Sequence, residues 1–575
     1  MTLTSRQKNV LSFLVLGVLF LLPLRGLLRA QGPPMEEGFM LVFPERVLAG
    51  DIPNVDFLHL YGPGSLWVLA GVYKIFGTQL VVERLFALLQ QIGIVLGMYG
   101  LARYWGRTLA LLCGVIALII IVPPIGLTAL AWDGGVALGL LGLLAALQGR
   151  RRFRWDQAKG LRWALVGGIV SGFALLYRLD LVIAVGLGLL VVWWGSERRF
   201  KLRLAGGFAI GVAGYLVHMA MAGPGNVIEG MVLQPVFDLR GGRKLPVPPP
   251  WDHFDGFLQK SGAIMPGHWP LPALRVPAQL TVWFFALLAS VLFLVVVAIW
   301  DMRRDRTRFR ARVLLAVALF SAGMVPQAMQ RVDSAHFAWV SCVPFAFVPV
   351  AVFELLRARV PRFSFRNTAF LSGAGVLVAM VLVIPQFTGW AYTDYVTQTF
   401  GRHRVVFKIE HDGRIFYYGR AEVADAANEL LAEVDQWAKP GDRLFVGTTD
   451  LRKTPLSEAY LYYMLPDYPP ATRYIEMDPG VANAKGSGMA SDLRAANIAI
   501  LSGAWNDWSE PNESRKLGSD ASNQVLVKDF CLVRNFGVYR TGDPLYQLFV
   551  RRPEGQPCPA GTTTPVHPKL HTPSS

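Results

Sequence analysis

Cysteines and charged residues are both scarce in this chain. Its 575 residues include four cysteines and no Cys-x-x-Cys pair, and the sequence has no His-Glu-x-x-His pattern, P-loop or dinucleotide-binding glycine fingerprint. Vicinal-thiol redox catalysis, zinc peptidase chemistry and nucleotide hydrolysis therefore have no recognisable site. Charged residues make up 17% of the chain, whereas a soluble protein carries about 25%.

Apolar residues take the place of the missing charge. They form 53% of the sequence, and the mean hydropathy is +0.38, which is typical of a polytopic membrane protein. The net charge of +16 could suggest a nucleic-acid partner, but the basic residues lie in short clusters between apolar runs. Such clusters orient helices in a membrane, so we expect no nucleic-acid partner.

Eleven apolar runs are long enough to be read as membrane-spanning helices. The run from Leu66 to Phe76 is too short to span and is predicted to be an interfacial helix. The predicted spans cover residues 9 to 29, 82 to 103, 108 to 124, 128 to 148, 161 to 177, 181 to 195, 203 to 221, 277 to 300, 311 to 328, 337 to 356 and 367 to 387.

Basic loops on one side predict the orientation. With a cytoplasmic N-terminus, the loops at residues 103 to 107, 150 to 162, 198 to 203, 303 to 312 and 357 to 366 all face the cytoplasm, as the positive-inside rule expects. Arg25 and Arg29, at the outer end of the first span, are exceptions. This orientation gives two long outer loops, at residues 31 to 81 and 222 to 276. The spans and their loops make up a predicted integral-membrane domain of residues 1 to 389.

The chain becomes soluble in character after the last span. A helical pattern at residues 423 to 442 and strand-like runs at 443 to 450, 497 to 503, 524 to 530, 536 to 542 and 546 to 552 predict a small extracytoplasmic α/β domain over residues 390 to 552. The Pro- and Thr-rich tail, residues 553 to 575, is predicted to be disordered. Cys113 and Cys342 are expected to fill the core, and Cys531 and Cys558 are candidates for a disulfide.

The first outer loop has the composition of an active-site loop. It places Glu36, Glu37, Asp51, Asp56 and His59 among Phe, Leu, Tyr and Pro residues. Carboxylates held at an apolar, membrane-level surface are costly unless they are paired, bind a metal or take part in chemistry.

Other ionisable residues collect at the outer ends of the spans, and the span centres are almost free of them. This distribution disfavours a transporter, which usually keeps ionisable groups near mid-bilayer. It suits the binding of an anionic lipid headgroup. The predicted substrate-binding residues are Asp56, His59, Asp133, Arg178, Asp180, Asp238, Arg240, Arg243, Arg331, Asp333 and His336.

The region after the first span has an acidic pair, followed by LVFPERVLAGDIPNVDF, Tyr-Gly-Pro and a short helix that ends before ERLF. This order of motifs resembles the GT-C class of integral-membrane glycosyltransferases. The likeness is sharpest from Glu36 to Arg84 and extends over about 390 residues as architecture. The C-terminal region resembles that of actinobacterial members. The resemblance implies a polyprenyl-phosphate-linked sugar donor and an acidic base in the first outer loop. The class usually has Asp-Glu there, so the pair Glu36-Glu37 leaves open which residue is the base.

The residues fit this chemistry independently. Transfer from a phosphate-linked sugar needs a carboxylate to take the proton of the acceptor hydroxyl, and arginines to stabilise the leaving phosphate. Glu36 or Glu37 is predicted to be the base. Each charged residue also has a structural alternative, as a helix-end ion pair or a loop contact. Glu36, Glu37, Asp133 and Asp238 offer oxygen ligands for a divalent metal such as Mg or Mn, without diagnostic spacing.

The leading prediction is therefore a glycosyltransferase of the outer face of the cytoplasmic membrane, acting on a cell-envelope glycan, lipid or protein. A lipid-linked glycan flippase and a non-catalytic envelope assembly protein are the alternatives. A flippase would move lipid without forming a glycosidic bond, and an assembly protein would tolerate loss of charge at Glu36 and Glu37. The sequence leaves the sugar, the prenyl length and the stereochemistry open.

Overall fold

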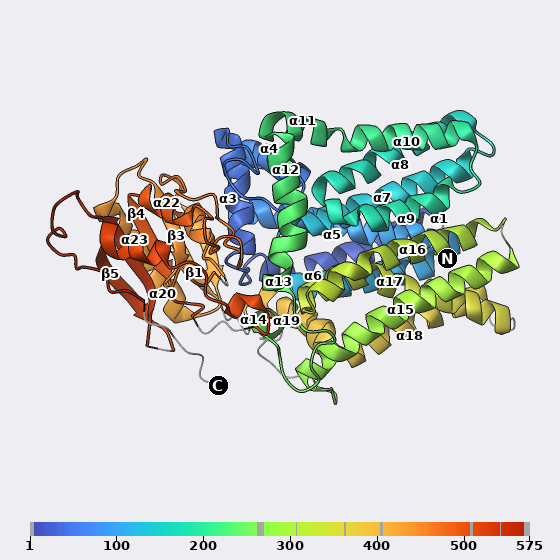
Figure 1. The fold of residues 1–575 in the computed structure, drawn as a ribbon. Helices are drawn as coiled ribbons and strands as arrows, with labels where there is room; N and C mark the ends of the chain where they lie inside the picture. The colour runs from blue at the N-terminus through green and yellow to red at the C-terminus, as the bar shows by residue number, and fades with distance from the viewer. Residues whose placement is uncertain are drawn as a thin grey trace.

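A bundle of long apolar helices carries a small α/β domain at one end (Figure 1). The structure is a computed structural model, and it describes residues 5–261, 270–305, 307–360, 364–402, 406–454, 456–506, 510–540 and 542–568. Within these ranges, ten helices are long and apolar enough to cross a membrane. The predicted multi-pass architecture is thus confirmed.

The ten span candidates match ten of the eleven predicted runs. They are built from α1 (Ser5–Leu21) with α2 (Leu24–Leu27), α5 (Leu80–Ala102) with η1 (Arg103–Trp105), α6 (Arg107–Ile125), α7 (Ala131–Arg152), α8 (Gln157–Tyr177), α10 (Arg198–Val212) with α11 (Gly214–Ala222), α15 (Val276–Arg304), α16 (Phe309–Gln330), α17 (Ser334–Arg359) and α18 (Phe365–Val383).

The remaining predicted span, residues 181 to 195, is a shorter helix. The apolar segment Leu179–Trp193 contains η2 (Leu179–Leu181) and α9 (Val182–Trp193), and at 1.5 Å per residue it is about 22 Å long, less than the ~30 Å of a bilayer core. It still links the end of the bundle where Val182 lines a cavity to the end that carries Arg150 and Arg312, so with it the chain passes along the bundle an odd number of times. Arginines from neighbouring helices reach the carbonyls at its end. Arg150 donates to Trp194 O at 2.7 Å, and Arg312 donates to Trp194 O at 2.6 Å and Val191 O at 3.1 Å. These bonds satisfy carbonyl oxygens at a helix end that would otherwise be left without donor partners.

Short helices lie between the bundle and the C-terminal domain. The first outer loop forms α3 (Glu36–Ala49) and α4 (Pro63–Phe76), and α4 contains the predicted interfacial helix. The long outer loop forms α12 (Pro224–Ile228), the π-helix η3 (Glu229–Asp238), α13 (Leu239–Arg243) and α14 (Phe257–Ser261). After α18, η4 (Pro385–Phe387) and α19 (Gly389–Thr399) lead to the C-terminal domain.

The C-terminal domain has a mixed sheet with strand order β3-β4-β6-β5 and a separate hairpin, β1-β2. Strands β3 and β4 are parallel, and β6 runs antiparallel to β4 and β5. The elements are β1 (Phe407–His411), β2 (Arg414–Tyr418), α20 (Ala421–Trp437), β3 (Leu444–Thr448), α21 (Tyr460–Met464), α22 (Met489–Arg494), β4 (Ile498–Ser502), η5 (Glu513–Arg515), α23 (Ala521–Asp529), β5 (Phe530–Val538) and β6 (Pro544–Arg551).

One strand prediction in this domain is wrong. The run 524 to 530 was expected to be a strand because of its valines, but α23 covers it up to Asp529 and β5 begins at Phe530. Val525 and Leu526 are buried on one side of α23, next to α22. Packing of this apolar face has overridden the weak β-propensity of the valines.

The start of the expected C-terminal tail is attached to the sheet. Cys531 of β5 forms a disulfide with Cys558, and Leu532 and Thr563 exchange two backbone hydrogen bonds of 2.8 Å each. Residues 569 to 575 lie outside the described residues. Cys113 and Cys342 are buried in the bundle as free thiols.

The two parts of the chain pack directly on each other. The backbone nitrogen of Tyr460 in α21 donates to Pro34 O at 3.2 Å, and Arg414 pairs with Glu45 of α3 at 2.7 Å. A Cβ on Gly38 would lie 2.3 Å from the Tyr460 nitrogen. Glycine is therefore required where α3 meets α21, and this contact fixes the start of α3.

Candidate active site

The acidic pair forms the first turn of α3. Pro33 and Pro34 precede it, and Glu36 and Glu37 are the first two residues of the helix. Carboxylates at this position interact favourably with the unpaired backbone N–H groups of a helix start. Neighbouring residues on a helix point in different directions, so the two glutamates meet different surroundings.

Glu37 is held in a buried ion pair. Arg84 of α5 donates to its two oxygens at 2.7 and 2.9 Å and also to Leu27 O at 3.3 Å. The side chains of Glu37 and Arg84 are 0% and 2% exposed. This bidentate pair ties α3 to α5 and to the end of the first span.

Glu36 faces two cavities instead. One has a volume of about 320 Å³ and the other about 390 Å³. They share Glu36, Leu130, Leu258, His336 and Trp339 in their walls. Oε2 of Glu36 is buried and has no hydrogen-bond partner among the described residues. The glutamate therefore lies at the junction of the two cavities with one oxygen that no described protein group engages.

The larger cavity, which we call the arginine cavity, combines cations with an apolar wall. Arg178, Arg243 and Arg331 line it. Its apolar wall consists of Leu60, Val182, Met231, Val232, Pro235 and Val236. Val182 and Val236 are 47% and 45% exposed, so this wall continues onto an apolar surface of the bundle. The cavity can hold an anionic group attached to a long apolar chain.

Arg178 is fixed by aromatic rings and a carboxylate. It forms two bonds of 2.7 and 3.0 Å with Asp180. Its guanidinium carbon lies 4.3 Å from the ring centre of Tyr61 and 5.0 Å from that of Trp132. Cation–π contacts of this kind hold a guanidinium in place and leave its edge open to a further anion.

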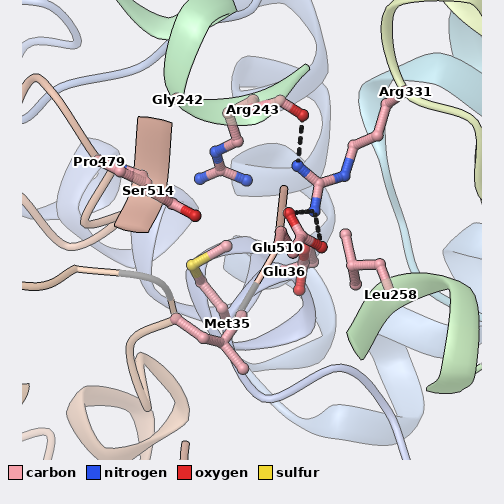
Figure 2. A pocket seen from close by; sticks show the side chains of 10 residues that line it. Met35, Glu36, Gly242, Arg243, Leu258, Arg331, Pro479, Glu510 and Ser514 are labelled. Atoms are coloured by element: carbon pink, nitrogen blue, oxygen red, sulfur yellow. Dashed lines mark hydrogen bonds and ion pairs between the residues drawn. The ribbon is translucent and has the colours of Figure 1, made fainter. Parts of the chain in front are cut away.

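Carboxylates of the C-terminal domain reach the other two arginines, and Figure 2 shows the one at Arg331. Arg331 donates to both oxygens of Glu510 at 3.0 and 3.1 Å, and to Arg243 O at 3.0 Å. Arg243 contacts Asp478 and lies 3.7 Å from Glu476. The C-terminal domain thus forms part of the wall of the arginine cavity.

The smaller cavity, which we call the polar cavity, has a mixed lining in which uncharged polar groups and carboxylates stand among apolar residues. Its polar lining includes Gln31, Thr128, Ser334, Gln386, Asp394 and Gln398, in addition to Glu36, Asp333 and His336. Hydroxyl and amide side chains are typical partners of a polyhydroxylated ligand. The absence of arginine from this lining, among the described residues, separates it from the arginine cavity.

Asp333 and His336 start α17 between the two cavities. Asp333 caps this helix by accepting from His336 N at 3.0 Å, and its oxygens lie 3.0 Å from His336 Nδ1. Burial would raise the pKa of Asp333, but His336 and Arg331 attract the carboxylate and hold its pKa below the ordinary value. Asp333 therefore remains an anion that orients His336.

The pKa of Glu36 shifts in the opposite direction to that of Asp333. Burial raises the pKa of Glu36, and the attraction of Arg243 and Arg331 offsets only part of the rise. A carboxylate with a raised pKa is a stronger base than an exposed glutamate. Its protonation state therefore responds to pH closer to neutrality.

Of the predicted site residues, seven line the cavities: Glu36, Arg178, Asp180, Arg243, Arg331, Asp333 and His336. The others lie elsewhere. Asp56 is exposed and accepts from Ile52 N at 2.7 Å, and Asp133 is buried 3.3 Å from the amide of Gln91. His59 is buried between the rings of Phe43 and Tyr61, and Asp238 and Arg240 are exposed.

The sequence reasoning missed the carboxylates of the C-terminal domain. Glu476 and Asp478 alternate with Ile475 and Met477, which are both 0% exposed. Alternation of this kind predicts an extended segment with one apolar and one polar face. This signal was present in the sequence, but the distance from the spans gave no reason to connect it with Arg243. Glu510 carries no comparable signal.

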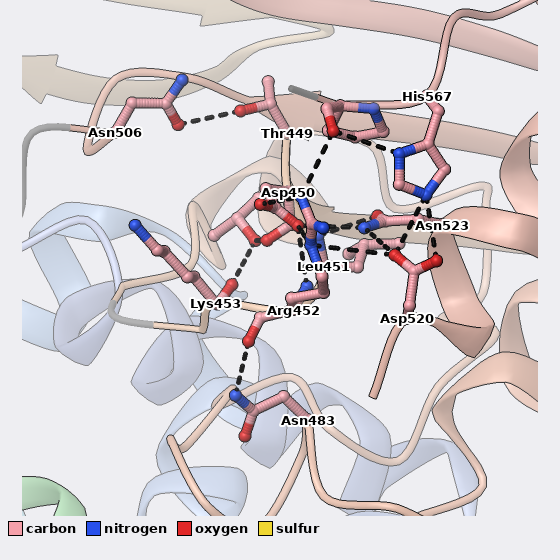
Figure 3. A network of polar contacts seen from close by, with 12 residues as sticks. Thr449, Asp450, Leu451, Arg452, Lys453, Asn483, Asn506, Asp520, Asn523 and His567 are labelled. Carbon is pink, nitrogen blue, oxygen red and sulfur yellow. Dashed lines mark hydrogen bonds and ion pairs between the residues drawn. The ribbon is translucent and has the colours of Figure 1, made fainter. Parts of the chain in front are cut away.

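A second polar network lies in the C-terminal domain after β3 (Figure 3). Asp450 accepts two bonds of 2.8 Å from Arg452 and one of 2.9 Å from Asn523, and Asp520 accepts from His567 at 3.0 Å. These groups satisfy one another, so the network fixes the loop after β3 to the C-terminal segment. In the ranges that the structure describes, no group of three or more His, Cys, Asp or Glu side chains is arranged to hold a metal ion.

Comparison with known proteins identifies the fold. No protein-family model and no curated protein sequence matches the chain. Among solved structures, ArnT from Cupriavidus metallidurans bound to undecaprenyl phosphate is similar, with a TM-score of 0.52 and 15% identity over 96% of this chain and 99% of that chain. ArnT in the apo state gives a TM-score of 0.51 and 15% identity over 94% of this chain and 97% of that chain. The chain therefore has the fold of the GT-C glycosyltransferases, as its resemblance to that class predicted.

Proposed function

We propose that this protein is a membrane glycosyltransferase that moves a sugar from a polyprenyl-phosphate donor to an acceptor hydroxyl. One observation carries the proposal: Glu36 presents an unpartnered carboxylate oxygen at the junction of two cavities of different chemistry. Two substrates that must react with each other can approach one base from its two sides. The ArnT fold, crystallised in one case with undecaprenyl phosphate, supports a lipid-phosphate donor.

The donor is assigned to the arginine cavity. Its phosphate would lie against Arg178, Arg243 and Arg331, whose planar guanidinium groups match phosphate oxygens. The prenyl chain would follow the apolar wall toward the exposed Val182 and Val236. The fixed cations stabilise the negative charge that develops on the phosphate as it leaves.

The acceptor is assigned to the polar cavity, where its hydroxyl meets Glu36. As the acceptor oxygen bonds to the anomeric carbon, the bond from that carbon to the phosphate oxygen breaks. The hydroxyl proton passes to Glu36, and the polyprenyl phosphate leaves with the bonding electrons. Asp333 orients His336 at the boundary of the cavities, where it can donate to a phosphate or acceptor oxygen. A glycan, lipid or protein of the cell envelope would supply the acceptor.

The site is assigned to the outer face of the cytoplasmic membrane, with the N-terminus in the cytoplasm. Arginine-rich helix ends lie at the opposite end of the bundle from the C-terminal domain, where Arg308 pairs with Asp301 and Glu354. Basic loops favour the cytoplasmic side. The Cys531–Cys558 disulfide supports an oxidising compartment for the C-terminal domain.

The direct test uses the purified full-length protein with a panel of polyprenyl-phosphate sugars and envelope extracts as acceptors. Mass spectrometry should detect release of polyprenyl phosphate together with a glycosylated acceptor. A parallel reaction with a chelator tests whether Mg or Mn assists the arginines. Transbilayer movement of labelled donor in liposomes without any new glycosidic bond would instead identify a flippase.

A further inference from the structure

An extended segment of the C-terminal domain lies against the arginine cavity. Along it, Ile475 and Met477 are fully buried in the apolar core of the protein, while Glu476 and Asp478 face Arg243. Side chains of an extended chain alternate between two faces. The apolar face therefore anchors the segment, and the acidic face is directed at the cavity that we assign to the donor.

Two hydrogen bonds to backbone carbonyls fix the segment just before Glu476. Arg473 O accepts from Leu58 N at 2.9 Å, which ties the segment to the first outer loop. Ile475 O accepts from Ser457 Oγ at 3.0 Å within the C-terminal domain. Glu476 is thus held by both parts of the protein, as a residue that positions a substrate should be.

The two carboxylates have different partners. Asp478 contacts the Arg243 guanidinium directly, whereas the nearest oxygen of Glu476 is 3.7 Å from it. The second oxygen of Glu476, Oε2, is buried with no hydrogen-bond partner among the residues described. The side chain is 4% exposed. A buried carboxyl oxygen without a partner is costly, so a ligand that donates a hydrogen bond to it is favoured.

The surroundings of Glu476 restrict which ligand that is. Glu476 lines the arginine cavity together with Tyr61, Arg178 and Glu36. Burial raises the pKa of Glu476 to about 7, against the attraction of Arg243 and Arg178. When the Glu476 carboxyl is ionised, it repels a phosphate monoanion or dianion. The phosphate is therefore better placed on the arginines. A hydroxyl group, by contrast, can donate to the free oxygen in either protonation state.

We propose that Glu476 is a positioning residue for the donor sugar, and that its free oxygen accepts a hydrogen bond from a sugar hydroxyl. The sugar lies between the phosphate on the arginines and the base Glu36, and the C-terminal domain takes part in selecting it. This inference rests on the proposed function. It assigns to the domain a role in sugar recognition that is separate from the chemical step.

The test compares Glu476→Ala and Glu476→Gln with the wild-type protein, and Glu429→Gln serves as a control. Glu429 is an exposed glutamate of the same domain, paired with Arg534. Each protein is assayed with the sugar donor that the wild type uses and with a series of donors that each lack one hydroxyl. Binding of polyprenyl phosphate without a sugar is measured in parallel, as a readout of the arginines alone.

One hydroxyl of the donor sugar is expected to bind Glu476. The donor that lacks this hydroxyl should react with the wild type at a kcat/KM roughly 10- to 100-fold lower than the complete donor. Glu476→Ala should show a similar loss with the complete donor, and should no longer distinguish it from that deoxy donor. Glu476→Gln retains an acceptor oxygen and should keep most of the discrimination. Glu429→Gln should behave as the wild type, and all four proteins should bind bare polyprenyl phosphate equally.

Three results would overturn the proposal. Glu476→Ala could lower kcat/KM for all donors by one common factor, it could weaken binding of bare polyprenyl phosphate equally, or both Glu476 variants could fail to fold. Each would assign Glu476 to the structure of the cavity and not to the sugar. If the wild type transfers no sugar from any donor, the proposed function itself fails, and this outcome is distinct from the other three.

Discussion

The buried pair Glu37–Arg84 allows the two glutamates of α3 to be distinguished. Glu37→Gln removes a charge that receives two hydrogen bonds of 2.7 and 2.9 Å. Because both side chains are at most 2% exposed, water cannot replace the lost partner. We expect a loss of stability with no specific effect on chemistry, whereas Glu36→Gln should do the reverse.

The size of the effect follows from burial. Removing one member of a buried ion pair typically costs about 3–5 kcal/mol. Glu37→Gln should lie near the lower end, because Gln retains an acceptor and Glu83 remains close enough to interact with Arg84. Arg84→Met should cost more, since it leaves Glu37 beside Glu83 without a cation. Glu37→Met combined with Arg84→Met should recover much of the loss, because no buried charge is left unpaired.

The assay measures thermal unfolding of the purified proteins in one detergent. For a chain of 575 residues, a cost of about 3 kcal/mol predicts a fall in the unfolding temperature of about 2–3 °C for Glu37→Gln. Turnover per folded molecule, measured well below that temperature, should stay within about threefold of the wild type. A Glu37→Gln protein with normal thermal stability and strongly reduced turnover would refute the structural role of this pair.

Further predictions concern pH, packing and topology. Because burial raises the pKa of Glu36 and only its ionised form accepts a proton, kcat/KM should fall as the pH drops through that raised value, with an acidic limb above the range of an exposed glutamate. Gly38→Ala should lower turnover, because its Cβ would lie 2.3 Å from the Tyr460 nitrogen and displace the start of α3. The control Gly71→Ala should be neutral, because its Cβ meets nothing within 4 Å. Equal turnover of the two variants would contradict the role of the contact between Gly38 and Tyr460. With the proposed orientation, Gln436→Cys should react with an impermeant maleimide in intact cells, and Gln157→Cys only after permeabilisation, both positions being exposed; the reverse pattern would contradict the topology.

Much of the membrane fold could be predicted from the sequence, because a bilayer imposes strict length and polarity limits on helices. The exception is α9, where an apolar run was read as a full span although the segment Leu179–Trp193 is short, and donors from Arg150 and Arg312 satisfy the carbonyl at its end. Those arginines lie about 40 and 120 residues away from it in sequence, as the separations of the bonded pairs show. No local pattern could reveal that contact. In the C-terminal domain, the valines of α23 indicated a strand because tertiary packing is invisible to propensity.

The candidate site was predictable only in part. Charged residues at span ends indicated Arg178, Arg331 and His336, because span ends on one side must share a surface. The choice between Glu36 and Glu37 depends on the direction of each side chain on the first turn of α3, and it required coordinates. Glu476 comes from another domain, and only the folded structure brings it to Arg243.

Glu36→Gln tests the central claim most directly. The substitution keeps the size of the side chain and removes its ability to take a proton, so donor binding should persist while turnover falls about 100-fold or more. Glu45→Gln is the matched control, since Glu45 lies on the same helix and pairs with Arg414 at the domain contact. Near-normal sugar transfer by a well-folded Glu36→Gln protein would contradict the account.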